Sequence, residues 1–192
     1  MKIGTCVNFS EIDGMGKKFA RLREHNFDSC QLVSWNPAAW TDENASLLKT
    51  LLEQYQITVS AFWCGWSGPA AWNFYDGPLT LGLVPVEYRQ MRIENLCDGA
   101  DFAHKLGITD VVTHMGFIPE NPYDPNFSSF CIAVRTVAEH LKKNGQCLLF
   151  ETGQETPVTM LRCFEAVGTD NLYVNLDLSL IHISEPTRHL RI

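Results

Sequence analysis

The sequence predicts an α/β protein built on a parallel sheet. Short runs rich in β-branched and aromatic residues alternate with stretches whose apolar residues recur at helical spacing, and six such strand–helix units follow one another up to residue 177. Alternation of this kind is typical of parallel strands joined by right-handed crossovers. No change in composition separates the units, so we predict one domain over residues 1–177. An open doubly wound sheet and a barrel both satisfy this pattern.

Six runs are predicted as strands because they are short, apolar and bounded by turn residues. They cover residues 3–9, 29–35, 57–66, 110–114, 147–151 and 172–177.

The stretches between the strands are predicted as helices. The first places Met15, Phe19 and Leu22 on one face, and Asn26 is expected to end it in the left-handed conformation. The next opens at Thr41, a residue type that caps helix N-termini. The later helices are expected to end at Gly107, Gly145 and Gly168, and the last one to begin with Thr156 as cap and Pro157 as first residue.

A long connection over residues 67–85 interrupts the regular pattern, and a proline-bearing loop covers residues 117–125. Loops as long as the first of these are usually functional or mobile inside a compact domain. The pair Gly14 and Gly16 lacks the third glycine of a dinucleotide-binding fingerprint, so we interpret it as an ordinary loop.

Composition excludes several classes of function. The chain is 45% apolar and 19% charged with a net charge of −7, so it has enough apolar residues for a core but no basic stripe for nucleic acid. No apolar run approaches the roughly 20 residues that span a bilayer. The seven cysteines contain no C-x-x-C pair, which is typical of reduced thiols packed as small hydrophobes and indicates a cytoplasmic protein.

Ionisable residues stand where three of the predicted strands end. Glu151 ends an apolar strand, Asp177 holds the same place one unit later, and His114 ends the strand before them. In a barrel these side chains would converge, as an oxygen-liganded divalent cation requires. Two structural acids bonded to nearby amides, and a satisfied half-buried histidine, are equally good explanations of the same positions.

Further candidates are less specific. Glu155 could contact a substrate, although its place at the start of a helix also suits the helix dipole. The tryptophans at strand ends and in the long connection could line a pocket wall that stacks on a sugar: Trp35, Trp63, Trp66 and Trp72.

The chain resembles the sugar phosphate isomerase/epimerase family of xylose isomerase-like TIM barrels. The segments that carry the resemblance are 66–75, 111–122 (VVTHMGFIPENP), 150–157 (FETGQETP) and 175–177. The resemblance implies an incomplete (β/α)8 TIM barrel with about six βα units present and strands 7 and 8 missing.

The resemblance also implies a site and a chemistry. Glu151 matches the first and Asp177 the second of four ligands to a divalent metal, which could be Mn, Co, Mg or Zn. Glu151 would also move a proton on the substrate carbon beside a metal-polarised carbonyl. His114 matches a substrate contact, and Trp35, Trp66 and Glu155 are predicted to bind substrate as well. The expected partner is a small sugar or sugar phosphate, with neither nucleic acid nor membrane, and the full-length parent could be a homo-oligomer.

Residues 178–192 depart from the family pattern. The run from Leu178 to Arg188 resembles the translation of a transposon-end adapter used to prepare sequencing libraries. We therefore expect a non-native, artefactual tail after Asp177, with a divergent natural tail as the alternative, and assign no ligand role to His182, Glu185 or His189. A chain cut in this way is expected to be inactive, because half of the metal ligands would be absent.

Two other functions on the same fold stay open. An inosose-type dehydratase would begin with the same proton abstraction. An endonuclease IV-like phosphodiester hydrolase needs a histidine-rich zinc cluster, but Trp35 and Trp66 stand where two of its histidines would be.

Overall fold

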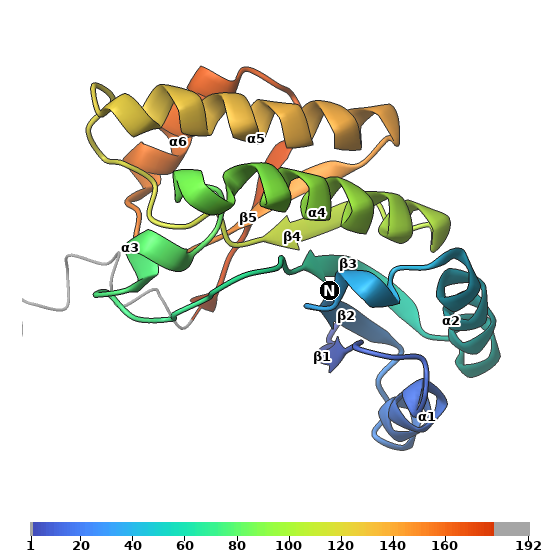
Figure 1. Cartoon of the computed structure of the whole chain (residues 1–192). Helices are drawn as coiled ribbons and strands as arrows, with labels where there is room; N and C mark the ends of the chain where they lie inside the picture. Colours follow the sequence, from blue (N-terminus) through green and yellow to red (C-terminus); the bar gives the residue numbers. More distant parts are fainter. Residues whose placement is uncertain (1, 179–192) are drawn as a thin grey trace, which may run out of the picture.

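The computed structural model describes residues 2–178, in which six parallel strands form one sheet in chain order (Figure 1). Each strand pairs with the next one along the chain. The strands are β1 (Thr5–Asn8), β2 (Ser29–Ser34), β3 (Thr58–Cys64), β4 (Asp110–Thr113), β5 (Cys147–Glu151) and β6 (Leu172–Asn175). Among the described residues the sheet is not closed, which is consistent with an incomplete (β/α) barrel.

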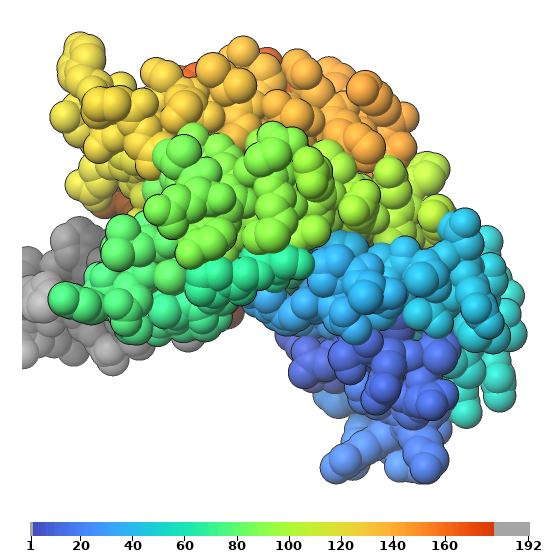
Figure 2. Space-filling view, in the orientation of Figure 1, coloured from blue at the N-terminus to red at the C-terminus, as the bar shows by residue number. Residues whose placement is uncertain are grey.

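The helices cover one face of this sheet. They are α1 (Met15–Glu24), α2 (Asp42–Tyr55), α4 (Val86–Lys105), α5 (Pro125–Lys143) and α6 (Pro157–Val167). Each of these packs beside the next, so the helices succeed one another around the sheet as the strands do. In the space-filling view the chain therefore passes in sequence order from blue through green to orange (Figure 2).

The predicted helix ends are confirmed where the backbone can test them. Thr41 and Thr156 cap α2 and α6 by accepting the amide hydrogens of Asn44 and Thr159, each at 3.2 Å. Asn26 has a φ of 62° and Gly168 a φ of 70°, the left-handed conformation expected of helix ends. The sequence did not predict the short helices η1 (Pro37–Ala39) and α3 (Gly77–Thr80), both of which carry a proline in the first turn.

The core lies between the helices and the sheet. Phe102 stacks there on Phe9 with ring centroids 5.6 Å apart and packs at a tilt against Phe62 at 5.8 Å, and all three are at most 1% exposed. A smaller cluster on the opposite face of the sheet contains Trp63, Trp66 and the aliphatic residues Ala61, Leu81 and Val112. Both faces are therefore apolar, as expected for a parallel sheet.

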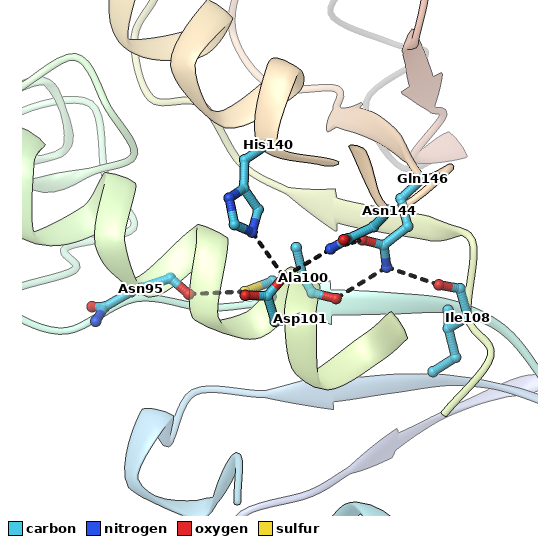
Figure 3. Close-up of polar contacts among 8 residues, drawn as sticks. Asn95, Ala100, Asp101, Ile108, His140, Asn144 and Gln146 are labelled. Carbon is cyan, nitrogen blue, oxygen red and sulfur yellow. Dashed lines mark hydrogen bonds and ion pairs between the residues drawn. The ribbon is translucent and has the colours of Figure 1, made fainter. Parts of the chain in front are cut away.

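A cluster of hydrogen-bonded polar side chains lies at the end of the sheet where the strands begin (Figure 3). The buried Gln146 amide donates to the carbonyls of Ala100 at 3.1 Å and Ile108 at 2.9 Å, which ties β5 to α4 and to the start of β4. Beside it, Asp101 accepts from Asn144 at 2.7 Å and pairs with His140 at 2.8 Å. These bonds join α4 and α5 at the end of the sheet opposite to the one where the strands finish.

Within the described part of the chain, no helix is both long and apolar enough to cross a membrane. The predicted tail falls almost wholly on residues 179–192, which lie outside the described residues, so its origin stays a prediction.

Candidate functional site

A cavity of about 290 Å³ lies at the end of the sheet where the strands finish. The registers of β4, β5 and β6 bring the segments after these strands together there, with Glu151 directly opposite Asn175. The 67–85 connection supplies the rest of the wall. The lining residues are Trp72, Asn73, Phe74, Leu81, His114, Phe117, Glu151, Thr152, Gly153, Gln154 and Asp177.

Glu151 is the last residue of β5 and is half-buried. The indole N–H of Trp63, on β3, donates to its Oε2 and fixes the orientation of the carboxylate. Burial, together with the negative charge of Asp177, raises the pKa of Glu151 to about 7. A carboxyl group with this pKa can both release and accept a proton at neutral pH.

Asp177 lies two residues beyond β6 and lines the same cavity. Its backbone N–H donates to the Thr152 hydroxyl at 2.9 Å, which holds the segment after β6 against the segment after β5. The two carboxylates are close enough for the charge of Asp177 to raise the pKa of Glu151. The structure therefore brings together the two acids that the sequence placed on neighbouring strands.

His114 follows β4 and is buried at 5% exposure. Its Nδ1 accepts the backbone N–H of Gly116 at 3.0 Å, so the neutral ring carries its proton on Nε2. Burial lowers the pKa of His114 to about 4, against the opposing effect of a hydrogen bond with Gln154. The imidazole is therefore neutral at physiological pH and offers an N–H donor.

The tryptophans form one connected cluster. Trp35 lies at its centre, with ring centroids 4.9 Å from Trp63, 5.0 Å from Trp66 and 6.1 Å from Trp72. Trp72 lines the cavity and meets the His114 ring edge to face at 5.2 Å. Trp35 and Trp66 do not line it, and Trp66 is only 3% exposed. Trp35, by contrast, is 38% exposed, and it reaches the cavity wall only through its contact with Trp72.

Glu155 does not line the cavity, but it bonds to Gly153, which does. Its Oε1 accepts the backbone N–H of Gly153 at 3.0 Å, and burial raises the pKa of this carboxyl while backbone hydrogen bonds partly oppose that effect. His114 and Glu155 both border the space beside Gly153, because a Cβ there would lie 2.6 Å from His114 Nε2 and 3.0 Å from Glu155 Oε2. A larger residue at this position would crowd both side chains.

Several lining residues were missed by the sequence reasoning. Asn73 and Leu81 belong to the 67–85 connection, which the sequence indicates to be functional or mobile without indicating which side chains face inward. Phe117 begins the 117–125 loop, for which the sequence predicts no site residue. Gln154 is part of the FETGQETP segment, in which the sequence predicts site roles for the two glutamates alone.

The donors present suit part of a metal shell. Carboxylate oxygens are the ligands that hard divalent cations prefer, and Glu151 and Asp177 supply two such groups at one cavity. Among residues 2–178, no group of three or more His, Cys, Asp or Glu side chains could hold a metal ion.

The chain consists of parallel βα units in chain order, and polar side chains converge where the strands finish. These two features define a barrel-type α/β protein whose cavity lies at the C-terminal ends of the strands, as is usual for this architecture. The family model described as "Xylose isomerase-like TIM barrel" matches residues 19–189. The chain belongs to this family, as the sequence resemblance predicted. No curated protein matches the chain by sequence.

Solved structures show the same fold. A xylose isomerase domain protein from Planctomyces limnophilus is 27% identical with a TM-score of 0.86, and the alignment covers 98% of this chain and 68% of that protein. A xylose isomerase-like TIM barrel protein from Mycobacterium smegmatis, in complex with magnesium, is 21% identical over 88% of this chain and 58% of that one, with a TM-score of 0.67. An L-ribulose 3-epimerase is 22% identical over 97% of this chain and 64% of that protein, with a TM-score of 0.71. The chain thus spans 58–68% of the length of these three proteins.

Proposed function

We propose that the full-length protein is a metal-dependent sugar isomerase or epimerase that moves a proton on a carbon next to a carbonyl group. The observation that carries this proposal is the placement of two carboxylates, Glu151 and Asp177, at one cavity at the strand ends, where the Trp63 indole N–H orients the Glu151 carboxylate. A positioned carboxylate beside a metal-polarised carbonyl is a general base for the neighbouring carbon. Epimerases among the structures of the same fold support the reaction class.

Each side chain at the cavity has a role in this proposal. Glu151 takes or returns the proton, and the Trp63 N–H bond holds the carboxylate toward the cavity. His114 and Gln154, whose side chains share a hydrogen bond at the cavity, would contact a substrate hydroxyl or carbonyl oxygen, with His114 Nε2 exchanging the Gln154 bond for one to the substrate. Trp72 offers an apolar face on which a sugar ring could stack.

The carboxylates of Glu151 and Asp177 would hold the metal, whether Mn²⁺, Co²⁺, Mg²⁺ or Zn²⁺. When bound, such an ion polarises the carbonyl and hydroxyl oxygens of the substrate. Two carboxylates are fewer ligands than such ions usually take from a protein site. We therefore expect the 192-residue chain by itself to bind metal weakly and to be inactive.

Supporting roles are proposed for the other predicted residues. Trp35 and Trp66 keep the Trp72 wall in place, since all three belong to one aromatic cluster. Glu155 shapes the turn at Gly153, against which the His114 ring packs.

The test is exchange of substrate protons with solvent. The full-length protein is incubated in D₂O with a panel of ketoses, aldoses and their phosphates, with Mn²⁺, Co²⁺ or Mg²⁺ added, and deuterium at the carbon beside the carbonyl is followed by NMR. We expect exchange with at least one sugar and its loss on chelation of the metal. Absence of exchange across the whole panel would contradict the proposed proton transfer.

A further inference from the structure

Arg92 is a charged residue in the interior of the protein. It lies on α4, is 0% exposed, and has no carboxylate within 4.0 Å among the described residues. Burial lowers the pKa of the guanidinium to about 10, so it stays charged at neutral pH. A buried charge is strongly unfavourable unless hydrogen bonds and polarisable groups replace its hydration. The partners of Arg92 therefore indicate what the residue does.

These partners are backbone carbonyls of the 67–85 connection. Nη1 donates to Gly82 O at 2.7 Å, Nη2 to Pro69 O at 2.8 Å, and Nε to Ser67 O at 3.4 Å. Ser67 and Pro69 begin the connection, and Gly82 lies close to its end. One guanidinium thus fastens both ends of the segment that carries Trp72, Asn73 and Phe74 to the cavity.

A second group on α4 strengthens the first of these attachments. Asn95 lies one helical turn after Arg92, and its Oδ1 accepts the backbone N–H of Ser67 at 2.8 Å. The guanidinium also stacks over the Trp66 ring at 5.2 Å. Because Trp66 contacts Trp35, and Trp35 contacts Trp72, Arg92 supports the aromatic wall as well as the backbone behind it.

The other end of the connection is locked to the segment that carries His114. Gly82 has a φ of 62°, and a Cβ there would lie 2.0 Å from the carbonyl carbon of Met115, so only glycine allows this approach. The next residue, Leu83, donates its N–H to Met115 O at 3.0 Å. Gly116 then donates to His114 Nδ1. A continuous set of contacts therefore runs from Arg92 through Gly82 to the imidazole.

We propose that Arg92 is a positioning residue, which holds the 67–85 connection so that Trp72 packs against His114 at the edge of the cavity. The proposal deepens the proposed function, because these are the groups that would contact the sugar. A lysine would keep the charge but lacks the planar fork that reaches three carbonyls.

The test uses the 192-residue chain and no turnover, so its result does not depend on whether the protein is an epimerase. Hydrogen–deuterium exchange is measured for peptides covering residues 67–84 in wild type, Arg92→Met and Arg92→Lys. NMR of the His114 ring protons reports whether Trp72 still lies against the imidazole. Gln146→Leu is the matched control, since it removes two buried hydrogen bonds to backbone carbonyls at the opposite end of the sheet.

We expect exchange in residues 67–84 to rise at least tenfold in both Arg92 variants, and the His114 signals to move toward those of an imidazole without a ring neighbour. Gln146→Leu should leave both readouts unchanged. Arg92→Lys keeps the test decisive if Arg92→Met fails to fold. A folded Arg92 variant with exchange within twofold of wild type, or with unchanged His114 signals, would overturn the proposal.

Discussion

The two ends of the sheet use buried polar groups in opposite ways. At the end where the strands begin, the Gln146 amide donates its hydrogens to the carbonyls of Ala100 and Ile108. At the end where they finish, Glu151 and His114 face a cavity. Burial raises the pKa of Glu151 and lowers the pKa of His114, and each shift favours the neutral form of the side chain. Polar groups of the first kind stabilise the fold. Those of the second kind are held at a cost to stability, which is typical of functional sites.

The largest effect that would sharpen this comparison is expected from Glu151→Gln. Removal of a proton-transfer group typically lowers the rate by about 10²–10⁴-fold. The amide can still accept the Trp63 hydrogen bond, and no buried charge remains beside Asp177, so the free energy of unfolding should not fall. Sugar deuteration by NMR and denaturant unfolding measure the two quantities. A full rate in this variant would remove Glu151 from the mechanism.

The pH dependence of stability offers the second test. The pKa of His114 is lowered from 6.5 to about 4, so between these pH values the unfolded chain binds a proton that the folded chain does not. The contribution of His114 to stability should therefore fall by up to about 3 kcal/mol as the pH drops through this window, since one pKa unit corresponds to about 1.4 kcal/mol. Glu151, whose pKa is raised from 4.5 to about 7, acts in the opposite direction over nearly the same range, so total stability does not report His114 alone.

The variant His114→Gln isolates this contribution. Urea unfolding of wild type and variant is compared at several pH values between 7 and 4. The difference in stability between the two proteins should shift in favour of the variant as the pH falls. A difference that does not change with pH would show that the folded protein accepts a proton on His114 as easily as the unfolded chain does.

At the opposite end, Gln146→Leu should lower stability without affecting chemistry. The variant leaves two buried carbonyls without their donor, which costs about 2 kcal/mol. Chemical denaturation should show this loss, while the exchange rate of the folded full-length protein should stay within about twofold of wild type. A change in rate as large as that of Glu151→Gln would abolish the proposed division between the two ends.

The smallest effect is expected from Asp101→Asn. Burial tends to raise the pKa of this carboxyl, but hydrogen bonds from Asn144 and His140 outweigh it and lower the pKa overall. A lowered pKa stabilises the fold above the usual carboxyl range and loses this effect as the pH falls. The side chains of His140 and Asp101 are 31% and 46% exposed, so solvent screens the pair and the change should stay below about 1 kcal/mol at pH 7 and shrink in acid. Unfolding at pH 7 and pH 3 measures it.

The fold could be predicted from the sequence because its signals are local. Thr41, Thr156 and Gly168 mark helix ends by capping chemistry that acts within one turn, and the strands are short apolar runs. The short helices at 37–39 and 77–80 were missed because each is a single turn inside a loop. The positions of Glu151 and Asp177 followed from the rule that parallel strands finish at one edge.

The environment of the candidate site was less predictable. That Trp63 would donate to Glu151 depends on side chains 88 residues apart in the sequence, and no local pattern encodes it. Arg92 did leave a signal, because it shares the buried face of α4 with Leu96 and Ala103 at helical spacing. An arginine within such an apolar stripe could have been chosen as a candidate from the sequence alone.

The most direct test of the central claim is the rate of solvent deuterium incorporation into sugar by Glu151→Gln, measured beside Gln146→Leu in the full-length protein. Both rates are taken at a temperature at which unfolding curves show each variant to be folded. We predict that Glu151→Gln loses at least 100-fold of the wild-type rate and that Gln146→Leu retains it. Equal rates in wild type and Glu151→Gln would contradict the assignment of proton transfer to this carboxyl group.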